Sequence, residues 1–96
     1  MQVLALRVEI HLPAAESLKA KRSVVKSIVE SARHRYGVAA AEVDHQDTWQ
    51  RAALGFAAVG GSVSHVRDVI DEVERFVWSN PDVDVTEVER TWLEPT

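Results

Sequence analysis

The chain has 96 residues, 46% of them hydrophobic, so it can build one compact core and fits a single domain over residues 1–96. It contains no cysteine, which excludes a disulfide framework and thiolate chemistry, and no apolar run approaches the roughly 20 residues of a membrane span. Residues 1–36 hold seven basic and three acidic residues, whereas residues 37–96 hold four and twelve. We expect a soluble cytoplasmic protein without a membrane partner, whose uneven charge governs what it binds.

The first part of the chain predicts a strand followed by a helix. Residues 2–12 alternate between apolar and mixed positions, which is the pattern of a half-buried strand. Pro13 ends this pattern, and Ser17 is a candidate N-cap for a helix that extends to Tyr36. Gly37 then stands where a left-handed residue commonly closes a helix.

A hairpin and a second helix are predicted next. Residues 38–44 and 49–59 read as strands separated by a polar turn, which indicates a hairpin. Ser62 is the candidate N-cap of the second helix, and Asn80-Pro81 ends it.

The last strand, residues 83–93, changes phase along its length. Val83 and Val85 share one face, but Val88 and Trp92 share the other, and a bulge near Thr86-Glu87 would reconcile them. The complete order is βαββαβ. It predicts an α+β, ferredoxin-like sandwich in which a four-stranded antiparallel sheet carries two helices on one face.

The predicted first helix is strongly basic, with Glu30 as its one acidic residue. Cations near a helix C-terminus are favourable, whereas each cation in the first turns costs about 0.3–1 kcal/mol. A phosphate bound at the helix N-terminus would compensate for the cost of the cations in the first turns. An ordinary solvated helix face, partly neutralised by carboxylates such as Glu16, is an equally open interpretation. We therefore expect a nucleic-acid-binding surface made of Lys19, Lys21, Arg22, Lys26, Arg33 and Arg35.

The outward face of the third strand carries small residues. Such residues suggest close approach by a flat surface, and a second copy of the sheet would fit. The alternative is an ordinary open sheet. No aromatic residue stands at the centre of this face, so we do not expect bases to be read across the sheet as in an RNA-recognition motif. The expected partner-binding residues of a homodimer are Arg51, Ala53, Gly55 and Ala57.

Acidic residues and a histidine cluster in the predicted hairpin at Glu42, Asp44, His45 and Asp47. Such groups could bind a divalent metal or serve as acid and base, so a small metal-dependent hydrolase at Asp44, His45 and Asp47 is an alternative. Neighbouring strand residues point to opposite faces, however, and aspartates also close turns. The sequence therefore favours a turn here, with no catalytic residue, metal ligand or cofactor assigned.

Two stretches resemble the YlxP-like family of small bacterial proteins. The first is His11-Leu12-Pro13 with residues 17–27 (SLKAKRSVVKS), and the second is residues 41–52 (AEVDHQDTWQRA). The resemblance implies a ferredoxin-like fold. It also implies a role linked to RNA or the ribosome, because genes of this family often lie near those for translation initiation and ribosome maturation. We accordingly expect a non-enzymatic binding protein whose partner is ribosomal RNA or a ribosomal particle.

Overall fold

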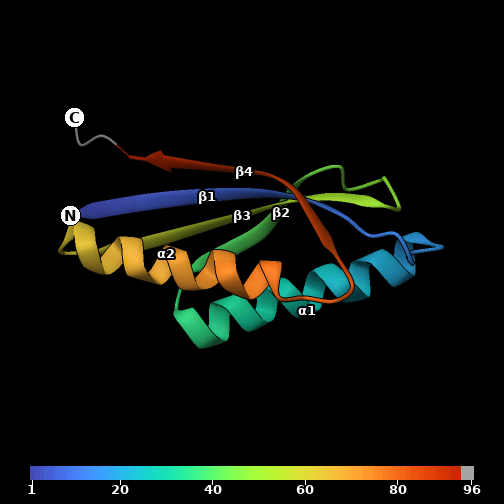
Figure 1. Cartoon of the computed structure of the whole chain (residues 1–96), viewed down its shortest axis with the longest axis horizontal. Helices are drawn as coiled ribbons and strands as arrows, with labels where there is room; N and C mark the ends of the chain where they lie inside the picture. The colour runs from blue at the N-terminus through green and yellow to red at the C-terminus, as the bar shows by residue number, and fades with distance from the viewer. Residues whose placement is uncertain (94–96) are drawn as a thin grey trace.

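A computed structural model describes residues 1–93 of the chain. Its four strands form one antiparallel sheet in the order β2-β3-β1-β4. The predicted ferredoxin-like α+β fold is thereby confirmed. Along the chain the elements are β1 Gln2–His11, α1 Leu18–Tyr36, β2 Ala39–Asp44, β3 Arg51–Gly60, α2 Val63–Trp78 and β4 Asp84–Trp92 (Figure 1).

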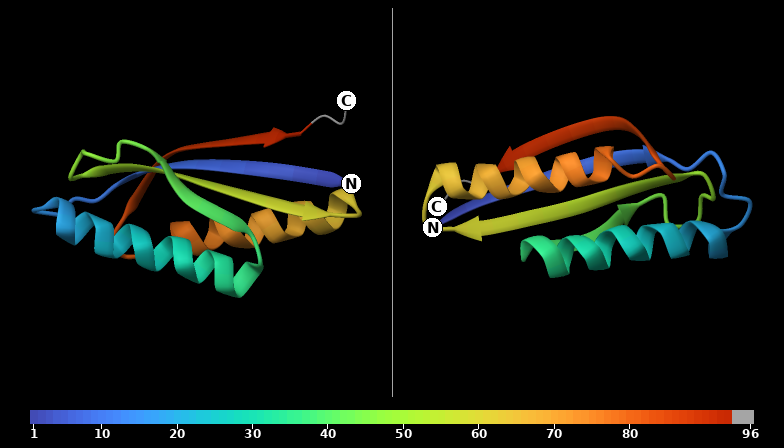
Figure 2. Two further views of the ribbon diagram at one scale, coloured as in Figure 1. Left: turned by 180° about the vertical axis from the view of Figure 1, so that it is seen from behind. Right: turned by 60° about the horizontal axis from the view of Figure 1, so that its bottom comes forward.

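Both helices cover the same face of the sheet, and the other face is open (Figure 2). Helix α1 packs over β2, and α2 packs over β1 and β3. Side chains at alternate positions of β1 enter the layer between sheet and helices, where the two helices meet them with apolar residues three and four positions apart. This core includes Leu4, Leu6, Val8, Ile10, Val25, Ile28, Ala32, Val66, Ile70, Val73 and Val77. Within residues 1–93, neither helix is long and apolar enough to cross a membrane.

The predicted helix ends are confirmed. The hydroxyl oxygen of Ser17 accepts from the backbone N–H of Ala20 at 3.0 Å, and Ser62 caps α2 in the same way. Gly37 adopts a left-handed conformation with φ 66°, and its N–H donates to the carbonyl of Arg33. These caps satisfy backbone groups that a helix leaves unpaired at its ends.

The predicted bulge in the last strand is also present. Glu87 pairs with Glu9 and Val85 pairs with Ile10, which leaves Thr86 as the extra residue of β4. The Thr86 hydroxyl donates to the carbonyl of Glu9. The bulge restores the phase of the strand, so apolar residues on both sides of it pack toward the core.

The connection between β2 and β3 is longer than predicted. Trp49 was expected in the third strand but lies in the loop, and β3 begins at Arg51. The reason is that Gln50 is bound elsewhere: its side-chain amide donates to the carbonyls of Pro13 and Ala15, and its own carbonyl accepts from the N–H of Leu12. The loop is therefore fastened to the segment that leads into α1.

Candidate nucleic-acid interface

The prediction that Lys21 belongs to a basic surface is wrong, because its side chain is fully buried. Its ammonium group lies 2.8 Å from Oε2 of Glu42 on β2. It also donates to the backbone carbonyls of His45 and Gln46 in the β2–β3 loop. The protein thus neutralises this cation internally, and Lys21 is closed to an external anion.

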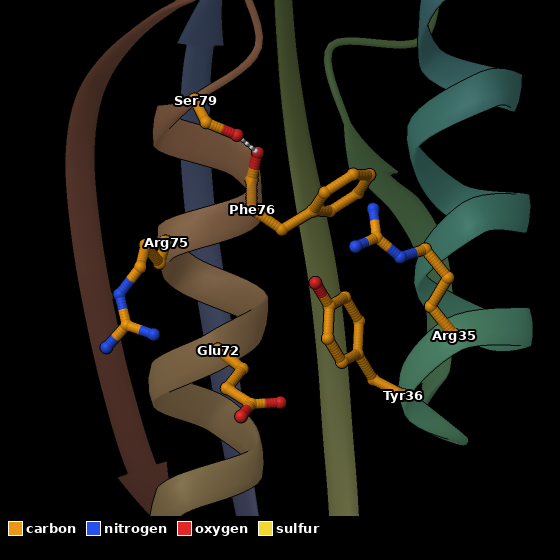
Figure 3. Close-up of a pocket in the computed structure, with 6 residues that line it drawn as sticks. All are labelled: Arg35, Tyr36, Glu72, Arg75, Phe76 and Ser79. Atoms are coloured by element: carbon orange, nitrogen blue, oxygen red, sulfur yellow. Dashed lines mark hydrogen bonds between the residues drawn. The ribbon is translucent and has the colours of Figure 1, made fainter.

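Arg35 is also separated from the other cations of α1. Its guanidinium carbon lies 5.3 Å from the ring centroid of Tyr36 and 5.2 Å from that of Phe76 on α2. Figure 3 shows Arg35 reaching toward these rings while Arg75 points away from α1. The six residues drawn there line a hollow of about 430 Å³ between the C-terminal ends of the helices. Arg35 therefore faces α2 and stabilises the helix pair by a cation–π contact.

Four cations remain on one exposed flank of α1, and we call them the basic stripe: Lys19, Arg22, Lys26 and Arg33. Their spacings of three, four and seven residues place them on one side of the helix, over a length of about 21 Å. Arg33 donates to the carbonyl of Ala40, so the stripe faces the edge strand β2 and points away from α2. Within the described residues, no carboxylate lies within 4.0 Å of the charged nitrogens of any of the four.

A second polar group lies on the open face of the sheet, and we call it the open-face cluster: Arg7, Glu9, Asp44, His45 and Arg51. Glu9 is its centre, with Nε2 of His45 at 2.7 Å, Nη2 of Arg51 at 3.2 Å and Nη1 of Arg7 at 3.4 Å from its carboxylate oxygens. Arg7 also lies 3.6 Å from Asp44. The three strands β1, β2 and β3 are thereby linked across the sheet.

This environment lowers the pKa of Glu9 from 4.5 to about 2. Hydrogen bonding with His45 is the largest cause, and Glu87 and Arg7 contribute, whereas desolvation acts in the opposite direction. Glu9 is consequently a carboxylate throughout the physiological range. It acts as a fixed negative charge, which is a structural role.

His45 is held from several directions in a left-handed backbone conformation, with φ 62°. Its N–H donates to Oδ1 of Asp44, its carbonyl accepts from Lys21, and its ring contacts Glu9. Asp47 does not join this group among the described contacts, so the three residues of the hydrolase alternative do not converge. Across residues 1–93, no group of three or more His, Asp or Glu side chains is arranged to hold a metal ion.

The residues expected to bind a second copy are largely occupied. Ala53 is fully buried, so its assignment to an exposed partner surface is wrong. Arg51 is paired with Glu9. A Cβ atom added at Gly55 would lie 2.8 Å from Cγ1 of Val43, so this glycine makes room for the chain's own neighbouring strand. Ala57 remains half-buried.

The sequence contained signals for several of these features. Lys21 is four and seven residues before Val25 and Ile28, which places it on the buried side of α1. Arg7 and Glu9 are two residues apart in a strand that the topology places inside the sheet. Both side chains are therefore expected on the open face, close enough to form an ion pair. No sequence pattern places His45 against Glu9, because that contact depends on the register of three strands.

Comparison with known proteins identifies relatives along most of the chain. Residues 3–90 match the family described as "Protein of unknown function (DUF503)". The chain is 36% identical over 79 residues to "Uncharacterized protein YlxP" of Bacillus subtilis (strain 168), which covers 82% of this chain and 86% of that protein.

A similar solved structure is the solution NMR structure of a de novo designed protein with a ferredoxin fold. The TM-score is 0.56 at 13% identity, with 99% of this chain and 88% of the designed chain covered. This likeness concerns the fold. From the extent of the family match and the identity to YlxP, the chain belongs to the DUF503 family, as its YlxP-like motifs predict.

Proposed function

We propose that this protein is a non-enzymatic RNA-binding protein that contacts phosphate groups through the basic stripe. The observation that supports the proposal is the contrast between Lys21, which has an internal carboxylate partner, and the four stripe residues, which have none within residues 1–93. Cations without an internal carboxylate partner on one flank of a helix suit a polyanion whose charges repeat at intervals along a chain.

The distribution of charge on the two helices favours one orientation of the RNA. Helix α2 carries Asp68, Asp71, Glu72 and Glu74, of which Asp71 and Glu74 pair with Arg90 at 2.8 Å and 3.0 Å. Acidic residues outnumber Arg67 and Arg75 on this helix, so a polyanion would be favoured less on this side than on the flank of α1 that points away from it. The net charge of −4 opposes indiscriminate binding, so the contact would be local and oriented. Ribosomal RNA is the source to test first, given the association that the YlxP-like resemblance implies.

The salt dependence of RNA binding tests this proposal. Fluorescence anisotropy of a short labelled single-stranded RNA should give a log–log slope of about −3 against salt, because four phosphate contacts contribute about −0.7 each. Replacing Lys19, Arg22 and Lys26 together by Ala should weaken binding and reduce the slope by about 2. Arg67→Ala, on the exposed surface of α2, is the control and should leave both quantities unchanged. Equal affinity of the triple variant and the wild type would refute the proposal.

A second candidate function is homodimerisation through the open face of the sheet. Val59 is 65% exposed there, and its cross-strand partner is Val3. Ala5 and Ala57 pair beside them, which extends the apolar area. Sedimentation equilibrium tests this candidate: a dimer that dissociates in Val59→Glu supports it, whereas a monomer at the highest accessible concentration counts against it.

A further inference from the structure

Trp49 is an exposed aromatic residue in a loop that is hydrogen-bonded to the segment leading into α1. It is 54% exposed and sits in the loop between β2 and β3. The other two tryptophans are engaged elsewhere: Trp78 donates from Nε1 to Glu74 on its own helix, and Trp92 packs against the core. The indole of Trp49 has no hydrogen bond to the described residues, so its ring is available for contact with a ligand.

The loop that carries Trp49 is fastened to the N-terminal end of α1 at both of its ends. Lys21 of α1 donates to the carbonyl of Gln46, and Gln50 donates to the carbonyls of Pro13 and Ala15. Figures 1 and 2 show this loop and the first turns of α1 together at one end of the molecule. Trp49 therefore lies at the same end as Lys19 and Arg22, the first two residues of the basic stripe.

The charge at this end of the molecule is nearly balanced. Glu16 and Asp47 are also exposed there, beside Lys19 and Arg22. A contact that does not depend on charge would therefore add to the phosphate contacts of the two cations. An aromatic ring beside cations is the combination with which proteins hold single-stranded nucleic acid, because a base stacks on the ring while its phosphate meets the cation.

We propose that Trp49 stacks on an unpaired base whose backbone runs onto the basic stripe at Lys19 and Arg22, so that the ligand is single-stranded RNA. This inference rests on the proposed function, since it requires RNA on α1. The buried Lys21 has a positioning role: it holds the loop so that the tryptophan stays beside the stripe.

Affinity for a single-stranded oligonucleotide tests the role of Trp49. Because stacking is worth about 1–3 kcal/mol per base, Trp49→Ala should weaken binding between about 5-fold and about 150-fold. Trp49→Phe retains an aromatic face and should recover most of the affinity. Trp78→Ala removes a ring of matched exposure, 57%, from α2 and should have no effect. Circular dichroism of each variant confirms that it is folded.

Tryptophan fluorescence distinguishes stacking from a purely structural role of Trp49, because only a base in contact with the ring would quench its emission. In a Trp78→Phe/Trp92→Phe variant, Trp49 is the single tryptophan, and RNA should quench the tryptophan emission. Inorganic polyphosphate, which has no bases, should cause no quenching at concentrations at which it binds the stripe. The companion variant Trp49→Phe/Trp92→Phe reports on Trp78 and should show no quenching with either probe.

The outcomes separate this inference from the proposed function. Single-stranded RNA that binds the stripe with unchanged affinity in Trp49→Ala and without quenching would overturn the stacking role and leave the phosphate contacts standing. Equal affinity for a fully paired RNA duplex would overturn it as well. Failure of the wild type to bind any RNA would remove both proposals.

Discussion

Lys21 and His45 are hydrogen-bonded: the ammonium group of Lys21 donates to the backbone carbonyl of His45, whose imidazole contacts Glu9 on the open face of the sheet. His45 therefore connects the buried ion pair of Lys21 and Glu42 with the open-face cluster. The pair fixes the β2–β3 loop relative to both faces of the sheet. The loop in turn carries Trp49, so this contact also helps to hold the residue proposed to stack on a base.

The buried ion pair should dominate the stability of this region. Lys21→Met leaves Glu42 without its partner, and we expect unfolding to become easier by about 3 kcal/mol, toward the low end for buried pairs because Glu42 is 17% exposed. For a domain of this size the melting temperature should fall by about 12 °C or more. Lys19→Met, on the exposed side of the helix, should change stability by less than about 0.5 kcal/mol. If the double variant Lys21→Met/Glu42→Leu recovers stability, the loss in Lys21→Met is caused by the unpaired carboxylate of Glu42.

The depressed pKa of Glu9 predicts a specific loss of stability in acid. The carboxylate form is favoured in the folded state, with a pKa of about 2 against 4.5, so its contribution is fully present above pH 4.5 and is lost as pH falls toward 2. Glu9→Gln should show a flatter dependence of unfolding free energy on pH across this window. Parallel curves for the variant and the wild type would show that Glu9 is not held by His45 and its neighbours.

The left-handed backbone of His45 predicts an unusual order among its substitutions. His45→Ala and His45→Gly both lose the contact with Glu9, but only glycine adopts a positive φ without strain. The glycine variant should therefore be more stable than the alanine variant by about 1 kcal/mol in urea denaturation. An alanine variant at least as stable as the glycine variant would contradict the positive φ.

Gly55 predicts a dependence on its neighbour. An added Cβ would meet Val43, so Gly55→Ala should destabilise the protein by about 1 kcal/mol. In a Val43→Ala background the same change should be neutral or stabilising, because the space is then free and alanine is favoured over glycine in a strand. A double-mutant cycle measures this coupling. Additive effects would mean that the two side chains do not compete for one space.

The elements of the fold were predictable because each depends on local chemistry. Ser17, Ser62 and Gly37 mark helix ends that short-range hydrogen bonds decide, and the phase change around Thr86 is visible in the strand itself. The cations of α1 were only partly predictable. The sequence specifies that Arg33 and Arg35 are separated by about 200° around the helix. It does not specify which of the two sides meets α2, because that depends on packing.

Features that join distant segments could not be predicted in the same way. The contact of Lys21 with Glu42 follows from how α1 lies over β2, and the loop position of Trp49 follows from the hydrogen bonds of Gln50 to residues 13 and 15. Sequence periodicity indicates which side of an element is buried. It does not specify the partner that the buried side meets.

The central claim, that the basic stripe binds RNA phosphate, is tested most directly by a matched pair of charge reversals. Arg22→Glu and Arg67→Glu change the net charge equally, but Arg22 lies on the stripe and Arg67 on the exposed surface of α2. The affinity of each variant for the same labelled single-stranded RNA is measured at one low salt concentration. We predict a loss of at least about tenfold for Arg22→Glu, the equivalent of about 1.4 kcal/mol, with little change for Arg67→Glu. Equal affinities in the two variants would contradict the claim, since the effect would then depend on net charge and not on the stripe.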